Sequence, residues 1–232
     1  KQFLHFVGPA VLISVGYVDP GNWATDIEGG SRFSYALIWV IVMSNAIAIV
    51  LQTLSARLGL VTGKDLSAQC SNYFPFPVAF VLWFLAELAI AATDLAEVLG
   101  TAIGLNLLFG LPMIWGVIFT AFDTFLFLAL QQFGHRVMEA FILFLMSIIC
   151  CCFIVEVFIA KPVPLDVIKG LVPSLPPGSL SVATGILGAT IMPHNLYLHS
   201  GLILTRRSND KVLTNRYTMF ALLDGLLSLN LA

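Results

Sequence analysis

Charged residues are scarce in this chain: Lys, Arg, Asp and Glu together make up only 10% of its 232 residues. Soluble domains carry about 25% charged residues, so a soluble globular fold is excluded for the sequence as a whole. Hydrophobic residues reach 59%, and the mean hydropathy is +0.95. The net charge of −2 offers no basic footprint for nucleic acid, and no such partner is expected.

Cysteine is also scarce, with four residues in the chain. Cys70 stands alone, and Cys150, Cys151 and Cys152 are consecutive, so on a helix their thiols point in different directions. Thiols in that arrangement neither pair readily nor share a metal ion. We therefore expect small apolar filler residues rather than a disulfide framework or a thiolate site.

The chain contains long runs without a charged residue. They cover Phe33–Ala56, Leu66–Ala86, Val98–Phe122 and Ala140–Val155. Because a membrane-spanning helix needs about 20 apolar residues, the sequence predicts an all-α polytopic protein in a lipid bilayer. The expected location is a cell membrane, with a bacterial plasma membrane favoured. Helices are expected over residues 3–18 (continuing to 29–30 after a break), 34–56, 77–104, 112–131, 137–160, 179–204 (also broken) and from 214 onward.

Two apolar segments are interrupted by helix-breaking tetrapeptides, Asp19–Asn22 and Met192–Asn195, each with proline second and asparagine fourth. Proline lacks a backbone N–H and clashes with the preceding turn, so a helix breaks or kinks at both places. Non-helical backbone at membrane depth is tolerated only where it is buried in protein or lines a cavity. Two interrupted segments in corresponding positions are typical of the substrate site of an inverted-repeat transporter.

The spacing of the breaks fits a duplication, because the 173 residues between Asp19 and Met192 match a first helix with a sixth. We therefore expect a first five-helix repeat over residues 1–160, an extramembrane linker over 161–177, and the start of a truncated second repeat over 178–232. Eight of the eleven Lys and Arg residues fall in loops on the N-terminal side, so the positive-inside rule predicts a cytoplasmic N-terminus. These residues are Lys1, Arg57, Lys64, Arg136, Arg206, Arg207, Lys211 and Arg216.

The break residues offer a mixed set of metal ligands. Asp19 supplies a hard carboxylate, Asn22 a carbonyl oxygen and Met192 a soft thioether. Where the sixth helix unwinds before Pro193, backbone carbonyls such as that of Ala189 lose their usual partners and become available. Oxygen ligands alone suit Mg²⁺, Ca²⁺ or Mn²⁺, whereas a thioether adds affinity for softer transition metals. The set therefore predicts selection of Mn²⁺ or Fe²⁺ over Ca²⁺ and Mg²⁺.

A row of carboxylates marks the third apolar segment. Glu87, Asp94 and Glu97 fall at offsets of seven and three residues, which places them within about one 80° sector of a helix. Acids in an apolar span are costly unless they face the bundle interior or water, and such rows mark proton relays. A structural role, such as bonding to a broken helix or pairing with Arg, stays open. His194 and His199 are further candidates for the proton pathway, although their five-residue spacing differs from the i, i+4 pair of zinc proteases.

At these residues the sequence closely resembles the NRAMP family of proton-coupled divalent metal transporters. The family's signatures are the Asp-Pro-Gly-Asn of the first helix and the Met-Pro-His of the sixth, and the resemblance extends through Gly8-Pro9, Gly29-Gly30, Ala92–Glu97 and Gly188–His194. It implies a LeuT-like fold and proton-coupled import of Mn²⁺ and Fe²⁺, with Cd²⁺ and Co²⁺ as further substrates and no prosthetic group. Family members have more helices than this chain supplies. The metal ligands that the resemblance implies are Asp19, Asn22, Met192 and the backbone carbonyl of Ala189.

Two other classes remain open from the residues alone. A LeuT-fold carrier of an organic substrate, such as an amino acid, would present half-helix N-termini to a carboxylate, and an acidic Asp19 near a thioether argues against it. An intramembrane metalloenzyme would need His and carboxylate ligands with a general base, and no His-Glu-x-x-His spacing is present. The protein is therefore expected not to be an enzyme. The sequence gives no oligomeric state.

Overall fold

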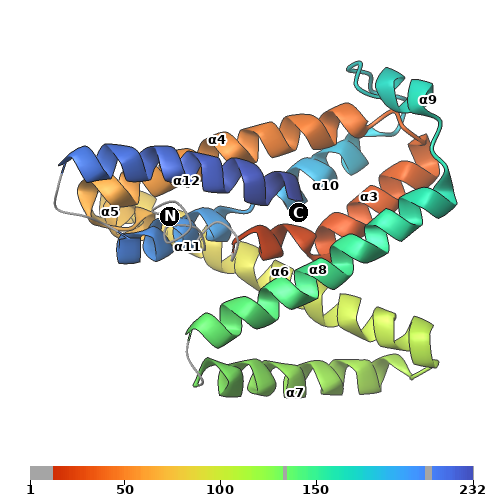
Figure 1. The fold of residues 1–232 in the computed structure, drawn as a ribbon, viewed down its shortest axis with the longest axis horizontal. Helices are drawn as coiled ribbons and strands as arrows, with labels where there is room; N and C mark the ends of the chain where they lie inside the picture. Colours follow the sequence, from red (N-terminus) through yellow and green to blue (C-terminus); the bar gives the residue numbers. More distant parts are fainter. Residues whose placement is uncertain (1–12, 133–134, 207–210, 232) are drawn as a thin grey trace. The chain divides into compact units, whose positions relative to one another are not determined.

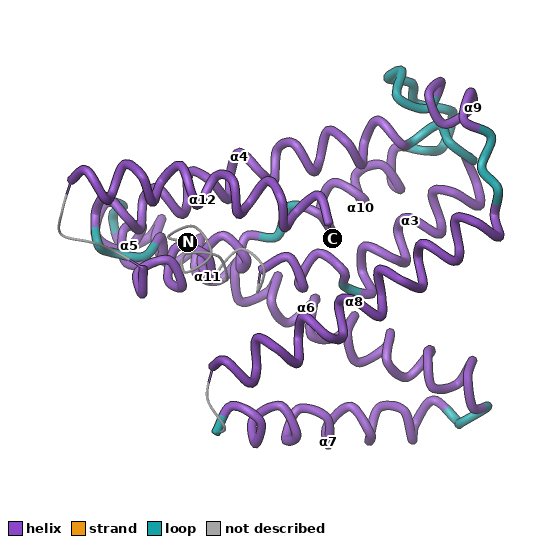
Figure 2. Tube along the Cα trace, viewed as in Figure 1, coloured by secondary structure: helices purple, strands orange, loops and turns teal. Residues whose placement is uncertain are grey.

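The computed structural model describes residues 13–132, 135–206 and 211–231, and the regular structure within them is entirely helical (Figure 2). The predicted all-α class is confirmed. In chain order the elements are η1 (Val15–Val18), α3 (Pro20–Phe33), α4 (Ile38–Thr62), α5 (Leu66–Tyr73), α6 (Phe76–Phe109), α7 (Met113–Gln131), α8 (His135–Ala160), α9 (Pro164–Lys169), α10 (Leu180–Thr190), α11 (Pro193–Leu202), η2 (Ile203–Arg206) and α12 (Lys211–Leu231).

The predicted helices match these elements with a few differences. α4 runs six residues past the expected end at Ala56, and α6 runs five residues past Gly104. The short helices α5 and α9 were not expected; α9 lies within the segment predicted as a linker. Most of the first expected helix, residues 3–18, falls in residues 1–12, which lie outside the described part of the chain, as does Lys1 at the N-terminus.

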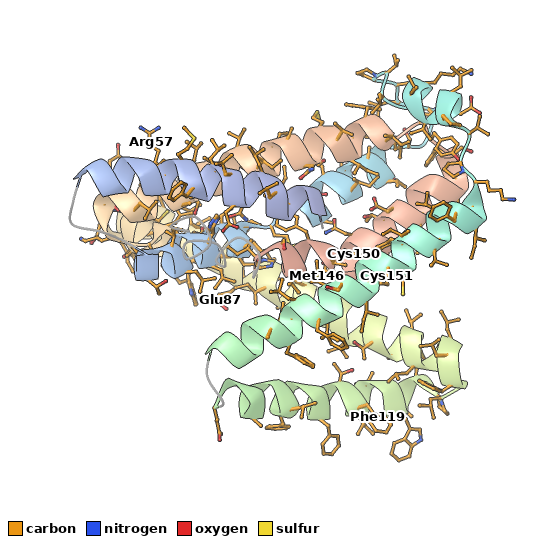
Figure 3. All side chains as sticks on the ribbon, in the orientation of Figure 1. Arg57, Glu87, Phe119, Met146, Cys150 and Cys151 are labelled. Carbon is orange, nitrogen blue, oxygen red and sulfur yellow. The ribbon has the colours of Figure 1, made fainter. Side chains whose placement is uncertain are left out.

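Three of the described helical stretches are long and apolar enough to cross a membrane: α4, α6 and Ala140–Ala160 of α8. Shorter apolar stretches occupy Met113–Phe122 in α7 and Thr218–Leu227 in α12. Large apolar side chains cover these helices on the outside, as Phe119 on α7 illustrates in Figure 3. Such exposed apolar surface is what a lipid-facing helix requires, because hydrocarbon, unlike water, does not penalise it.

The chain divides into two compact units. One contains the residues up to Val18 together with Asn22–Ala89 and the segment from Pro162 onward, and the other contains Asp19–Gly21 and Ile90–Lys161. Helix α6 therefore begins in the first unit and ends in the second.

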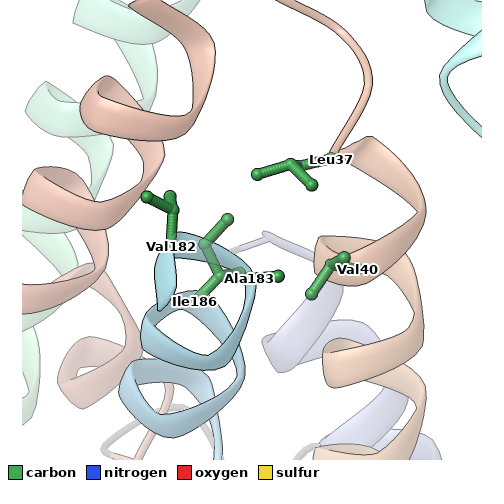
Figure 4. Packing of buried hydrophobic residues seen from close by; sticks show 5 residues of the cluster. All are labelled: Leu37, Val40, Val182, Ala183 and Ile186. Carbon is green, nitrogen blue, oxygen red and sulfur yellow. The ribbon is translucent and has the colours of Figure 1, made fainter. Parts of the chain in front are cut away.

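Helix α4 is the centre of the first unit, where it packs against α10, α11 and α12 (Figure 1). A cluster of buried apolar residues joins it to α10, as Figure 4 shows. Two further clusters join α4 to η2 and α12 and to the first helix. The residues of the α4–α10 cluster are Leu37, Val40, Val182, Ala183 and Ile186.

Close backbone contact fixes α4 against α11. A Cβ at Gly59 would lie 2.7 Å from the carbonyl oxygen of Ser200 and 2.8 Å from Cγ2 of Ile203, so the helices approach closely only because residue 59 has no side chain. Small residues serve this purpose in membrane interiors, where helices associate through van der Waals packing. On the same pair of helices, the Ser55 hydroxyl donates to the carbonyl of Leu196.

Helix α4 ends at Gly63, whose φ of 71° is left-handed and whose N–H donates to the carbonyl of Gly59 at 2.9 Å. Asp65 then caps α5 by accepting from the backbone N–H of Ala68 at 2.7 Å. The Ser67 hydroxyl donates to the same carboxylate oxygen at 2.6 Å, and these bonds hold the pKa of the Asp65 carboxyl below its ordinary value. Capping explains why the polar sequence after α4 still forms a helix.

The second unit contains the C-terminal part of α6 with α7 and α8. Gly116 on α7 faces Ala102 on α6, where a Cβ at residue 116 would lie 2.6 Å from the Cα of Ala102. Gly100 on α6 likewise leaves room for the Pro20 ring, to which a Cβ would come within 2.4 Å. Because residue 100 has no side chain, α6 can pack closely against Pro20, the first residue of α3 after the break.

Candidate functional site

The first helix is interrupted where the sequence predicts. Residues Val15–Val18 form a 3-10 turn, α3 begins at Pro20, and Asp19 lies between the two. Proline suits the first position of a helix, since no intrahelical partner exists there for an N–H. The Asn22 side chain, 9% exposed, donates from Nδ2 to the backbone carbonyl of Tyr17 at 3.0 Å. This bond ties together the chain on the two sides of the break.

The sixth helix is interrupted in the same way. Helix α10 ends at Thr190 and α11 begins at Pro193, with Met192 in an extended conformation (φ −91°, ψ 111°). In a continuous helix the carbonyl of Ala189 would accept from the N–H of residue 193, but proline has none. The predicted interruption is confirmed, and it deprives the Ala189 carbonyl of its regular helical donor.

Within the first unit the two interruptions meet. The Thr190 hydroxyl, in the last turn of α10, lies 2.8 Å from the carbonyl of Ile186 and 3.4 Å from Oδ1 of Asn22. On the other side of the α10–α11 break, the Asn195 amide lies against the backbone of Gly16, where a Cβ would be only 2.6 Å from Nδ2. Thr190 and Asn22 are 168 residues apart in the chain, so distant segments of the sequence form one polar region here.

Met192, which the sequence predicts as the soft ligand, is buried in this region. Its side chain is only 4% exposed, and its Sδ accepts a hydrogen bond from Nδ2 of Asn195 at 3.2 Å. Asn195 itself is 5% exposed. Met192 and Asn22, two of the four predicted ligands, are thus buried side chains at the two breaks of the first unit.

Asp19 belongs to the second unit. The residue is 7% exposed, and its carboxyl group folds over Gly21, where a Cβ would lie 3.0 Å from Oδ2. In the same unit, Glu97 on α6 experiences the charges of Asp94 and Asp19. Glu97, predicted for the proton pathway, and Asp19, the predicted carboxylate ligand, are therefore electrostatic neighbours.

The third carboxylate of the predicted row, Glu87, lies on the part of α6 that belongs to the first unit (Figure 3). All three acids of α6 have exposed side chains. His194 lies half-buried in the first turn of α11.

A buried polar network surrounds His199, which is only 1% exposed. Its Nδ1 lies 2.8 Å from Oε1 of Gln52 on α4, and Nε2 of Gln52 donates to the Tyr17 hydroxyl at 3.0 Å. Because an amide oxygen only accepts, Nδ1 carries the hydrogen in this arrangement, which leaves the buried Nε2 as an acceptor in the neutral ring. Sequence reasoning named His199 but missed Gln52 and Tyr17.

A cluster of conventional metal-binding side chains is not part of this region. Across residues 13–132, 135–206 and 211–231, no group of three or more His, Cys, Asp or Glu side chains is placed to hold a metal ion. Any metal ion here would need amide, thioether or backbone ligands in addition to a carboxylate.

Helices apolar enough to cross a membrane, together with two interrupted segments in contact, are the features expected of a polytopic membrane transporter. The sequence matches the family described as natural resistance-associated macrophage protein-like, Nramp, over residues 10–232, and the chain belongs to that family. The predicted family is thereby confirmed, and it includes relatives named as divalent metal cation transporters.

The sequence is similar to curated proteins from different organisms. The chain is 52% identical over 236 residues to a natural resistance-associated macrophage protein 2 homolog of Dictyostelium discoideum, covering 100% of this chain and 37% of that protein. It is 49% identical over 237 residues to the divalent metal cation transporter MntH of Agrobacterium fabrum, covering 100% of this chain and 51% of that protein. The chain thus spans about half or less of the length of these relatives.

A solved structure shares the fold. The manganese transporter of Eremococcus coleocola, in complex with an aromatic bis-isothiourea substituted compound, matches with a TM-score of 0.88 and 40% identity. The match covers 100% of this chain and 49% of that one.

Proposed function

We propose that this protein carries divalent transition-metal ions, Mn²⁺ and Fe²⁺ above all, into the cell by alternating access coupled to protons. Cd²⁺ and Co²⁺ are further substrates in this proposal. The observation that carries it is the contact of the two helix interruptions, through Thr190 and Asn22, next to the buried thioether of Met192. Relatives named as divalent metal cation and manganese transporters support a metal ion as the substrate.

The proposed ligands are the Asp19 carboxylate, the Asn22 amide oxygen, the Ala189 carbonyl and the Met192 thioether. The bond from Nδ2 of Asn22 to the Tyr17 carbonyl supports this role, because it directs the amide oxygen to the other side, toward Thr190 of the second interruption. The proline at 193 supports the role of Ala189, whose carbonyl has no regular helical donor. Three oxygen ligands with one sulfur ligand favour Mn²⁺ or Fe²⁺ over Ca²⁺ and Mg²⁺.

The proposed architecture is a LeuT-like inverted repeat in a lipid bilayer, with the N-terminus in the cytoplasm. The two breaks support it because they share one local design. In each, a proline occupies the first position of the new helix, and the asparagine two residues later, Asn22 or Asn195, reaches back with its side-chain amide to a residue before that helix. In inverted-repeat transporters, corresponding interruptions of this kind lie at the substrate site.

The proposed proton pathway includes Glu87, Asp94, Glu97, His194 and His199. Its support is the electrostatic interaction of Glu97 with Asp94 and Asp19 in the second unit. A dication beside Asp19 would therefore favour release of a proton from its neighbours, which is the coupling a symporter needs.

Metal uptake into proteoliposomes tests this function. Asp19→Asn keeps the size of the side chain but removes the charge that balances a dication, so Mn²⁺ uptake should fall to background at every pH. Asp166→Asn, which neutralises an exposed carboxylate on α9 paired with Lys169, is the matched control and should transport normally. Substantial uptake by Asp19→Asn at saturating Mn²⁺ would contradict the proposal.

A further inference from the structure

Asn195 lies in the first turn of α11, where a polar side chain can bond back to the residue that precedes the helix. It is the third residue of the helix and is buried to 5% exposure. Its side chain makes a bond to Sδ of Met192, the residue that precedes the helix.

This bond resembles a capping box in which the third residue of the helix bonds the side chain, and not the backbone, of the residue before the helix. In a capping box the side chain at the third position reaches back to the residue that precedes the helix and accepts from its backbone N–H. Here the third residue reaches back in the same direction but donates to the side-chain sulfur. Met192 makes no side-chain capping bond of its own, so the contact serves the sulfur rather than the helix end.

The contact restricts a side chain that is otherwise adaptable. Methionine has three rotatable bonds and a polarisable sulfur, which usually lets it fill irregular space. The sulfur is a weak acceptor, and an N–H on one of its two lone pairs leaves the other lone pair for a metal ion. Fixing the sulfur in this way removes the cost of ordering it when the ion binds.

The first helix holds the amide in place from the other side. At Gly16 a Cβ would lie 2.6 Å from Nδ2 and 3.2 Å from Oδ1 of Asn195, so the amide packs directly on the backbone there. The amide therefore links the two broken helices, and the absence of a side chain at residue 16 is what gives it room.

We propose that Asn195 is a positioning residue for metal selectivity: its amide, packed on Gly16, holds the Met192 thioether in the orientation that binds a soft ion. The inference rests on the proposed role of Met192 as a metal ligand. Asn195 acts through the sulfur and does not itself bind the ion.

A double-mutant cycle tests the proposal, with Cd²⁺ and Ca²⁺ binding to the purified protein measured by calorimetry. Asn195→Leu keeps a similar branched shape but has no donor. It should weaken Cd²⁺ binding by about threefold to tenfold, the cost of reordering one flexible side chain, and leave Ca²⁺ binding unchanged. In a Met192→Ala background the same substitution should have no further effect on Cd²⁺. Asn106→Leu removes a comparable amide bond, to the carbonyl of Leu111, and should leave both ions unaffected.

Gly16→Ala provides a second route, since its Cβ displaces the amide and should lower Cd²⁺ affinity without changing residue 195. Unchanged or tighter Cd²⁺ binding by both Asn195→Leu and Gly16→Ala would overturn the inference. An equal loss in the Met192→Ala background would also overturn it, because the amide would then act independently of the sulfur. If Met192→Ala alone leaves Cd²⁺ binding intact, the proposed ligand role of Met192 is what fails.

Discussion

Restoring a backbone N–H at the sixth-helix break tests whether the proline there serves metal binding. In Pro193→Ala the new N–H is four residues beyond the Ala189 carbonyl and can form the helical bond that proline prevents. A carbonyl engaged in that bond is a poorer metal ligand. The variant should therefore bind metal less tightly although the protein itself becomes more stable.

The size of both effects follows from one hydrogen bond. A net contribution of about 0.5–1.5 kcal/mol corresponds to a loss of Mn²⁺ affinity between about twofold and tenfold. The same free energy raises the melting temperature by a few degrees, at about 2–4 °C per kcal/mol for a domain of this size.

Calorimetric Mn²⁺ titration and thermal unfolding of the detergent-purified protein provide the two readings. Pro164→Ala is the matched control, because Pro164 also occupies the first position of a helix, α9, but belongs to neither interrupted segment. That variant should bind Mn²⁺ as the unmodified protein does. Wild-type Mn²⁺ affinity in Pro193→Ala would refute the role assigned to the break, and a lower melting temperature would refute the restored bond.

Two further predictions concern coupling and packing. Neutralising either acid of the second unit, by Asp94→Asn or Glu97→Gln, should preserve metal transport but reduce proton transport. Both are measured in the same vesicles, as metal flux and internal pH, and a wild-type ratio of protons to metal would remove both residues from the pathway. Gly59→Ala should destabilise the protein by about 1–3 kcal/mol through overpacking, offset in part by a gain of about 1 kcal/mol in helix propensity, because its Cβ meets the Ser200 carbonyl at 2.7 Å. Gly201→Ala on the facing helix has no atom within 4 Å of its Cβ and should keep or raise the melting temperature, so an equal drop in both variants would contradict the packing argument.

Apolar runs located the long helices but not their ends. The predicted second helix stops at Ala56 because Arg57 is charged, yet α4 continues to Thr62. A charge marks where a helix leaves the apolar layer, whereas this helix ends at Gly63, whose left-handed φ of 71° terminates it. The short helices α5 and α9 were missed because eight and six residues are too few to show a helical periodicity.

Prolines made the two interruptions predictable, and the types of metal ligand proposed at them rest on the chemistry of the side chains there. The neutral polar residues around them did not, because an Asn, Gln or Tyr in an apolar segment carries no charge that signals its role. Gln52 and His199 are 147 residues apart in the chain, so only the fold brings them together. Asn195 was visible in the second tetrapeptide, but its bond to Met192 depends on the extended backbone at the break.

Competition between ions tests the central claim most directly. In proteoliposomes, Mn²⁺ uptake is measured against increasing Ca²⁺ or Mg²⁺ for the unmodified protein and for Met192→Ala. The account predicts that the unmodified protein ignores a large excess of the hard ions, while Met192→Ala loses Mn²⁺ affinity and becomes sensitive to both, because only oxygen ligands remain. A Met192→Ala variant that retains the full preference for Mn²⁺ over Ca²⁺ would contradict it.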